Sequence, residues 1–245
     1  MYTQPKILYE DEYLLAIDKP SGMVVNRGFG AVDTVQDWIN STQDFPLAHN
    51  FELRNGVVHR LDKETSGVLL IAKTEDVLRT LQGQFKSREM EKVYVGLVHG
   101  MVEPQTGEID APVARNPKNR MRFGVVEGGR DAVTKYRVVA HFSARPEGRR
   151  LKSANTAEFS LVEFYPKTGR THQIRVHAKH IGHPIVSDYL YAGRKTARHD
   201  RKWCPRLFLH AAELTFKHPK SGERITVKAP LPHDLSKVLA HLSAH

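Results

Sequence analysis

A carboxylate inside a charged segment, between two apolar runs, is the first candidate for chemistry in this sequence. Asp62 lies in the hexapeptide His59–Glu64, which follows Val57-Val58 and precedes the apolar run Val68–Ala72. Thr65-Ser66-Gly67 indicates a turn, and the apolar run is typical of a strand covered on both faces. We therefore expect Asp62 on a loop fixed at both ends by core elements, where a carboxylate can act as a nucleophile or as a base.

A second candidate is the basic segment Pro166–His177, which contains T-G-R-T-H-Q-I-R-V-H. Thr171 is expected to cap a helix that continues to Ile181 and stops at Gly182. The helical period places Ile174, Ala178 and Ile181 toward the core, and it places His172, Arg175 and Lys179 together on another face. One face would hold the helix in place, and the other would be available for chemistry.

Four histidines that lie close together, His172, His177, His180 and His183, are candidate metal ligands. Zinc sites on helices commonly use two ligands at i and i+4, and a carboxylate or thiolate completes the set. The spacing here crosses Gly182, and no acidic residue lies inside the segment. We therefore expect no metal.

The central motif has a family resemblance. H-R-L-D-x-x-T-S-G followed by an apolar strand resembles the RluA-type pseudouridine synthases, and similar motifs extend from Ile7–Asp11 and Asp18–Gly22 to Ala229–Leu231. K-x-Y-x-x-x-x-x-G at Lys92–Gly100 matches as well. The resemblance implies Asp62 as the catalytic residue, Tyr94 against the target base, and Arg175 as the partner of that aspartate. It assigns a supporting, architectural role to Asp18–Gly22.

The activity implied by the resemblance is the isomerisation of specific uridines in structured RNA to pseudouridine, with ribosomal RNA favoured over transfer RNA. No cofactor is expected, because nothing is oxidised and no group is lost. A uridine in a stem must be flipped out to expose C1′. Arg60 is then the candidate to fill the vacated stack, and its alternative role is a salt bridge to Glu64.

Two other functions were kept open. A glycoside or nucleoside hydrolase would need a second carboxylate, for which Glu64 is the nearby candidate. A non-catalytic RNA-binding module on the same fold would be expected to lack Asp62, Tyr94 or Arg175, and all three are present.

The charge balance agrees with an RNA partner. The 245 residues include 37 Lys and Arg against 27 Asp and Glu, a formal net charge of +10, and this excess favours a polyanionic partner. Basic residues near the motifs or in two basic segments are the candidate RNA contacts. They are His59, Arg60, Arg115, Lys118, Arg120, Arg122, Arg170, His172, Arg194 and Lys195.

The resemblance implies a mixed α+β fold, with a mainly antiparallel central sheet, flanking helices and an RNA-binding cleft, and the pattern of strands and helices agrees with it. We expect a single catalytic domain over residues 1–245, in two halves at about 1–100 and 101–245, without the S4-type domain that many members carry. Helices are expected over Thr34–Ser41, capped by Asp33, and over Glu75–Met90, capped by Thr74. A helix is also expected over Asp234–Leu242.

Short strands are expected over Ile7–Tyr9 and Tyr13–Asp18, a longer strand over Lys92–Gly100, and a final hairpin that includes Leu214–Phe216 and Ile225–Lys228. Long strands are expected over Val133–Phe142 and Ala157–Phe164, joined by a turn over Ser143–Thr156. Two segments, Glu108–Val125 and Tyr189–Lys202, are expected to be basic loops.

One cysteine, Cys204, excludes an internal disulfide framework and a Cys-rich zinc module. No apolar run approaches the roughly 20 residues that a membrane span needs, and the amino-terminal residues do not resemble a signal peptide. We therefore expect a cytoplasmic protein with no membrane association. No obligatory protein partner is evident from the sequence.

Overall fold

The computed structural model describes residues 4–28, 33–117, 119–144 and 157–244. The chain forms two compact units, each made from two stretches of sequence. The first unit comprises Met1–Lys92 and His210–Pro230, and the second comprises Val93–Leu209 and Leu231–His245. The first unit thus includes His210–Pro230, which the predicted division at about residue 100 assigns to the second half.

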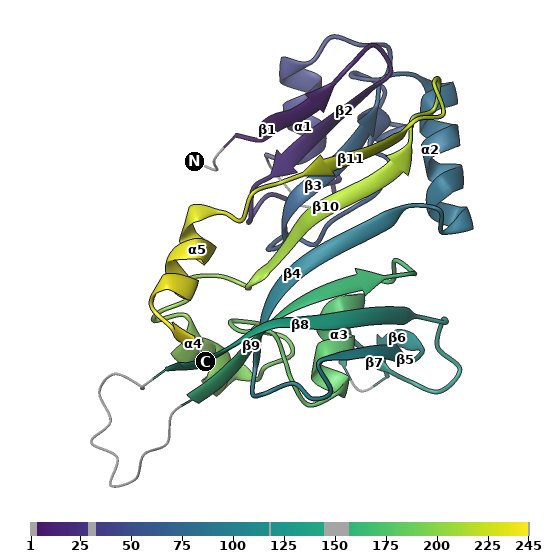
Figure 1. Ribbon diagram of the computed structural model, residues 1–245. Coiled ribbons are helices and arrows are strands. Elements are labelled where there is room, and N and C mark those ends of the chain that lie inside the picture. Colours follow the sequence, from purple (N-terminus) through teal and green to yellow (C-terminus); the bar gives the residue numbers. More distant parts are fainter. Residues whose placement is uncertain (1–3, 29–32, 118, 145–156, 245) are drawn as a thin grey trace, which may run out of the picture. The chain divides into compact units, whose positions relative to one another are not determined.

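The first unit is built on a sheet in which β1, β2, β3 and β10 follow one another, and β11 pairs with β10 (Figure 1). The pairs β1–β2, β2–β3 and β10–β11 are antiparallel, whereas β3 and β10 are parallel. The strands are β1 (Lys6–Glu10), β2 (Leu14–Lys19), β3 (Ser66–Ala72), β10 (Leu209–Lys217) and β11 (Arg224–Lys228). Every residue of β3 is buried, as its apolar run predicts.

Helix α2 (Glu75–Ser87) packs against β3 in the first unit, and α1 (Val35–Thr42) and the short 3₁₀ helix η1 (Arg54–Gly56) complete it. Val77, Leu78 and Leu81 of α2 join a core with the apolar residues of β2 and β3. The helix has Thr74 as its N-cap residue, as predicted, but it ends at Ser87 rather than Met90. Arg88 adopts a left-handed conformation with φ of 64°, which stops the helix there.

The cap of α1 was predicted one residue too early. Thr34, not Asp33, is the N-cap residue: its hydroxyl accepts the backbone N–H of Asp37 at 3.1 Å, and the Asp37 carboxylate accepts the N–H of Thr34 at 3.0 Å. This reciprocal pair is a capping box. Asp33 has φ of 55° and lies before the cap.

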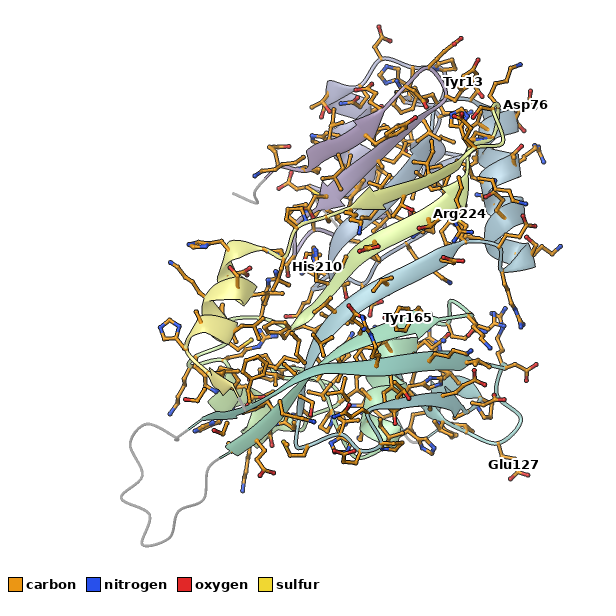
Figure 2. All side chains as sticks on the ribbon, viewed as in Figure 1. Tyr13, Asp76, Glu127, Tyr165, His210 and Arg224 are labelled. Atoms are coloured by element: carbon orange, nitrogen blue, oxygen red, sulfur yellow. The ribbon has the colours of Figure 1, made fainter. Side chains whose placement is uncertain are left out.

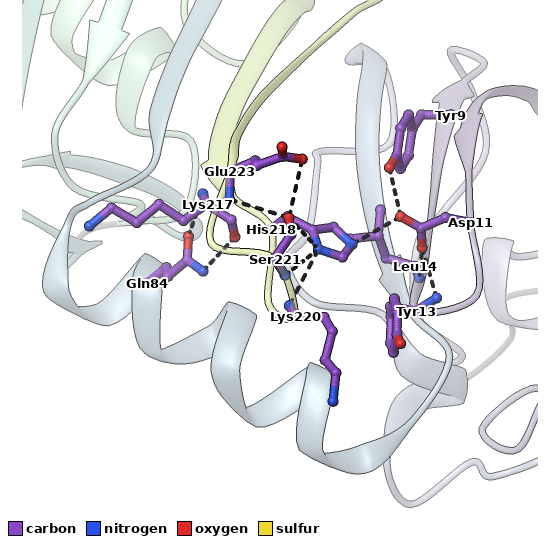
Figure 3. Close-up of polar contacts among 10 residues, drawn as sticks. All are labelled: Tyr9, Asp11, Tyr13, Leu14, Gln84, Lys217, His218, Lys220, Ser221 and Glu223. Atoms are coloured by element: carbon purple, nitrogen blue, oxygen red, sulfur yellow. Dashed lines mark hydrogen bonds and ion pairs between the residues drawn. The ribbon is translucent and has the colours of Figure 1, made fainter.

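A polar network joins two turns of the first unit, the one after β1 and the one after β10 (Figure 3). The Asp11 carboxylate accepts the Tyr9 hydroxyl at 2.6 Å and lies 3.0 Å from Nε2 of His218. Nδ1 of His218 accepts the backbone N–H groups of Lys220 and Ser221, so Nε2 carries the proton and donates to Asp11. The network therefore connects the turn after β1 to the turn after β10.

In the second unit the antiparallel strands follow the order β4, β9, β8, β12, and β5 pairs with β8 (Figure 1). A separate hairpin is formed by β6 and β7. The strands are β4 (Glu91–His99), β5 (Thr106–Asp110), β6 (Val113–Asn116), β7 (Asn119–Val125), β8 (Val133–Ala144), β9 (Ala157–Pro166) and β12 (Ser243–Ala244). The helices are α3 (Gln173–His180), α4 (Arg194–Asp200) and α5 (His233–Ala240).

The mixed α+β fold with mainly antiparallel strands is therefore confirmed, and so are the two long strands and the helix near the C-terminus. The prediction of a loop is wrong for two segments. The segment Glu108–Val125 contains β6 and β7, whose alternation is obscured by arginines, and Tyr189–Lys202 contains α4. Most of the predicted turn over Ser143–Thr156 lies outside the described residues.

Helix α3 begins later than predicted and is buried on more sides. Its N-cap residue is His172, which has φ of 57° and makes no capping side-chain bond, so Thr171 is not the cap. The amide of Gln173 instead accepts the N–H of Arg170 at 2.9 Å and donates to the carbonyl of Val133 at 3.1 Å. Because Arg175 is buried along with the apolar residues, the predicted polar face is not an open one.

Candidate active site

The loop that carries Asp62 is held by the segment that follows β2. The buried ammonium of Lys19 donates to the carbonyl of Lys63 at 3.3 Å, and the N–H of Gly22 donates to the same carbonyl at 2.8 Å. The hydroxyl of Ser21 donates to the carbonyl of Glu64 at 2.7 Å. Asp62 itself is half-buried. The supporting role expected for Asp18–Gly22 thus has a physical basis in three hydrogen bonds to consecutive carbonyls.

His59 supports the same loop from the side of β3. Its Nε2 accepts the backbone N–H of Leu70 at 3.2 Å, and its ring packs on Phe85 of α2 with 4.7 Å between centroids. Burial, together with the positive charge of Lys92, lowers the pKa of His59 to about 3. The ring is therefore neutral near pH 7, and it contributes no charge toward RNA.

The end of the loop lies close to β10. Gly67 has φ of 116°, and a Cβ atom there would lie 2.1 Å from the carbonyl oxygen of Ala211. Next to it, the hydroxyl of Ser66 contacts Nδ1 of His210 at 2.9 Å, and Nε2 of His210 donates to the carbonyl of Ala229 at 3.1 Å. His210, labelled in Figure 2, is fully buried. These contacts join the start of β3 to a segment more than 140 residues later.

Arg60 is exposed on this loop. Its predicted salt bridge to Glu64 stays a prediction. A long exposed cation next to Asp62 is suited to reach into RNA.

Tyr94 and Arg175 belong to the second unit. Tyr94 is half-buried on β4, opposite Phe164 of β9 in the strand register. Arg175 lies on α3 with only 4% of its surface exposed, and it forms a bidentate pair with Asp188, a residue outside the predicted motifs. Nε of Arg175 donates to Oδ2 of Asp188 at 2.7 Å, and Nη2 donates to Oδ1 at 2.8 Å. No sequence signal marks Asp188, because its spacing of 13 residues from Arg175 follows no helical or strand period.

The predicted RNA contacts in the second unit lie on the β6–β7 hairpin, at the start of α4 and at the start of α3. Arg115 is exposed on β6 with its guanidinium over the ring of Phe123, 5.2 Å from the centroid, and Arg122 is half-buried on β7. Arg194 and Lys195 are exposed at the start of α4. Arg170 and His172 are half-buried at the start of α3, and Nε of Arg170 donates to the carbonyl of Asp131 at 3.0 Å. Lys118 lies outside the described residues, and Arg120 is described only by its backbone.

The histidines near α3 have structural roles. His177 is fully buried, with Nε2 3.0 Å from the carbonyl of Ala111 and Nδ1 2.9 Å from the hydroxyl of Thr134. Burial lowers its pKa. Nδ1 of His183 lies 2.8 Å from the carbonyl of His99. In the described part of the chain, no group of three or more His, Cys, Asp or Glu residues is arranged to hold a metal ion.

Residues 13–180 match the family model described as RNA pseudouridylate synthase. The chain belongs to the RNA pseudouridylate synthase family. The predicted RluA-type resemblance is confirmed, and the chain is an RNA pseudouridine synthase, an isomerase. None of the helices in the described ranges is both long and apolar enough to cross a membrane.

Relatives of this synthase chain match it over nearly its whole length. An uncharacterised RNA pseudouridine synthase from Synechocystis sp. is 39% identical over 96% of this chain and 68% of the relative. Ribosomal large subunit pseudouridine synthase D from Xanthomonas campestris pv. campestris is 39% identical over 96% of this chain and 69% of the relative. Among solved structures, human RNA pseudouridylate synthase domain containing 1 has a TM-score of 0.74 and 26% identity, over 99% of this chain and 89% of the human chain.

Proposed function

We propose that this chain isomerises specific uridines of ribosomal RNA to pseudouridine, with Asp62 as the reactive carboxylate and with the target nucleotide flipped out of its stem. The observation that carries the proposal is the loop of Asp62, which is braced by Lys19, Ser21 and His59. A half-buried carboxylate on a loop held by these hydrogen bonds can keep a fixed position relative to the reacting atom of a substrate. The name of the Xanthomonas relative, ribosomal large subunit pseudouridine synthase D, favours ribosomal RNA over transfer RNA.

The reaction balances without a cofactor. The bond between C1′ and N1 of the uridine breaks, the uracil turns, and C5 joins C1′. The proton on C5 is then lost, and N1 gains one. Asp62 either attacks C1′ or removes a proton from the sugar, and both roles need it ionised.

The other members of the site have complementary roles in the proposal. Arg175 pairs with Asp62 and stabilises its charge where water is excluded, since an unpaired buried carboxylate is costly. Tyr94 stacks against the extruded uracil. Arg60, exposed beside Asp62, enters the stack that the nucleotide leaves.

In addition to Arg60, RNA is held by basic residues of the second unit. Arg115, Arg122, Arg194 and Lys195 contact the phosphate backbone, and Arg170 and His172 lie near the start of α3. We also infer that the chain works in the cytoplasm and without an obligatory protein partner. Its one thiol, Cys204, is buried, and burial raises the pKa of Cys204 to about 11, as suits an unreactive cysteine.

The test uses purified protein with unmodified ribosomal RNA and, separately, unmodified transfer RNA, followed by nucleoside analysis and mapping. Asp62→Asn is compared with Glu64→Gln, which changes the next acid of the same loop. We expect pseudouridine at a few positions of ribosomal RNA from wild type and Glu64→Gln, and none from Asp62→Asn.

Each other outcome rejects part of the proposal. Modification of transfer RNA alone would reject the target. Free uracil among the products, together with loss of activity in Glu64→Gln, would support the hydrolase alternative. Tight RNA binding without any new nucleoside, unchanged in Asp62→Asn, would support a binding module instead.

A further inference from the structure

A fully buried carboxylate, Asp188, holds the guanidinium of Arg175 in one orientation. Besides its two bonds to Arg175, the carboxylate accepts the backbone N–H groups of Leu190 at 3.0 Å and Tyr191 at 3.1 Å, both through Oδ1. Its own position is therefore set by the chain that follows it. Because Asp188 engages Nε and Nη2, the edge of the guanidinium that carries Nη1 is the one through which Arg175 can act on another acid.

The turn that presents Asp188 is itself fixed. The preceding residue, Ser187, has φ of 61°, a left-handed conformation that needs support in a residue other than glycine. Its N–H donates to the carboxylate of Asp200 at 3.0 Å, and its hydroxyl donates to the carbonyl of Cys204 at 2.6 Å. Ser187, Asp188 and Asp200 are all buried. Such support is expected where the direction of a side chain matters.

Tyr191 covers the face of the same guanidinium. Cζ of Arg175 lies 5.0 Å from the centroid of the Tyr191 ring, which is 4% exposed. The hydroxyl of Tyr191 accepts the backbone N–H of Phe123 on β7 at 3.0 Å and lies 2.8 Å from Nδ1 of His172. Asp188 thus fixes the guanidinium within its plane, and Tyr191 limits its movement out of that plane.

A buried ion pair of this kind adds little net stability, since the desolvation of both charges offsets their attraction. Its geometry is well defined, because the planar fork of arginine matches a carboxylate through two parallel bonds. The arrangement is therefore better suited to orienting a group than to stabilising the fold.

We propose that Asp188 and Tyr191 are positioning residues for Arg175, acting on the reaction through its guanidinium. This inference rests on the proposed role of Arg175 at Asp62. Tyr191 contacts both the guanidinium of Arg175 and, through the N–H of Phe123, the hairpin of β6 and β7. The hairpin that carries Arg115 and Arg122 is therefore held by the same side chain that covers Arg175.

The test is single-turnover kinetics on an RNA that the wild type modifies, with RNA affinity measured for each variant. We expect Asp188→Asn to keep its RNA dissociation constant within about twofold, because no RNA contact is removed. Its maximal rate should fall roughly 100-fold, the loss associated with a misplacement of about 1 Å. Tyr191→Phe keeps the ring, loses the hydroxyl, and should slow the reaction by roughly threefold to tenfold.

A double-mutant cycle separates positioning from general support. If Asp188 acts through Arg175, then Asp188→Asn should have little further effect on the rate once Arg175→Lys is present. The matched control is Asp234→Asn, which breaks another bidentate Arg–Asp pair in the same unit, with Arg206. The control should leave the maximal rate within about twofold of wild type.

The proposal is overturned if the two substitutions have independent, multiplicative effects on the rate, or if Asp188→Asn reacts at the wild-type rate. Tyr191→Phe, a mild substitution, keeps the proposal testable should Asp188→Asn fail to fold, and a wild-type rate in Tyr191→Phe would then reject it. Failure of the proposed function itself would be distinct, because the wild type would then make no pseudouridine.

Discussion

The buried ammonium of Lys19 donates a hydrogen bond to the carbonyl of Lys63, across 44 residues of sequence. It also donates to the carbonyls of Pro20 at 2.8 Å and Met23 at 2.9 Å. One side chain therefore joins the turn after β2 to the loop of Asp62.

Replacing Lys19 by methionine should destabilise the first unit by about 2–4 kcal/mol, because buried carbonyls lose their donor while the apolar stem is kept. Urea unfolding followed by the fluorescence of Trp38, which lies on α1 in the first unit, measures the loss. Lys6→Met, on the exposed edge of β1, is the control and should change stability by less than about 0.5 kcal/mol. Equal unfolding midpoints for the two variants would contradict this role of Lys19.

Gly67→Ala should be strongly destabilising, by at least about 3 kcal/mol, because the new Cβ would meet the carbonyl of Ala211 and φ is positive. Gly83→Ala is the matched comparison. Gly83 lies inside α2 with nothing within 4 Å of the added carbon, so the change should stabilise the protein by about 0.5–1 kcal/mol. Opposite shifts in melting temperature are expected, and a shift of Gly67→Ala toward higher stability would exclude the close approach to β10.

The pH dependence of stability should report His59, whose pKa is lowered to about 3 by burial and by Lys92. Above the unfolded pKa of about 6.5, neither state binds the proton. Below it, the unfolded state binds a proton that the folded state refuses, so stability falls as the pH drops from about 6.5 toward 3.

This contribution should reach roughly 1.4 kcal/mol per pH unit within that window. Between pH 7 and 5, wild type should therefore lose about 2 kcal/mol more than His59→Gln, which carries no titrating ring. Urea unfolding at a series of pH values gives the comparison. His49→Gln, an exposed histidine, should keep the wild-type slope.

The salt dependence of RNA binding should test whether Arg115 contacts phosphate. Arg115→Ala should weaken binding to all RNAs similarly, and it should reduce the slope of log affinity against log salt by about 0.7–0.9. Arg137→Ala is the control, because Arg137 pairs with Glu163 at 2.6 Å. An unchanged slope in Arg115→Ala would remove the hairpin from the RNA interface.

Local patterns in the sequence predicted the strands around Asp62, the long strands β8 and β9 and most helix positions, because alternation, helical period and turn residues are short-range signals. The hairpin of β6 and β7 was missed because Arg115 and Arg122 interrupt its apolar alternation. Asp33 was preferred to Thr34 as a cap because both are good capping residues, and only the backbone decides between them.

The supports of the candidate site were harder to predict. Asp188 contacts Arg175 through a turn whose shape depends on Ser187 and Asp200, and nothing in the sequence around Asp188 indicates that turn. His59 was predicted to bind RNA because it stands beside Arg60. Its neutral, packed ring follows from Phe85 and Leu70, which lie on other elements.

The parallel pairing of β3 with β10 has a consequence for synthesis of the protein. The amino-terminal part of a chain leaves the ribosome first, so Asp62 and β3 emerge long before His210 and Ala211. These two later residues pair with Ser66 and Gly67 of β3. Until those residues emerge, β3 lacks its neighbour, and the loop before it lacks one of its supports. The newly made chain therefore completes the support of the Asp62 loop only after His210 and Ala211 have been made.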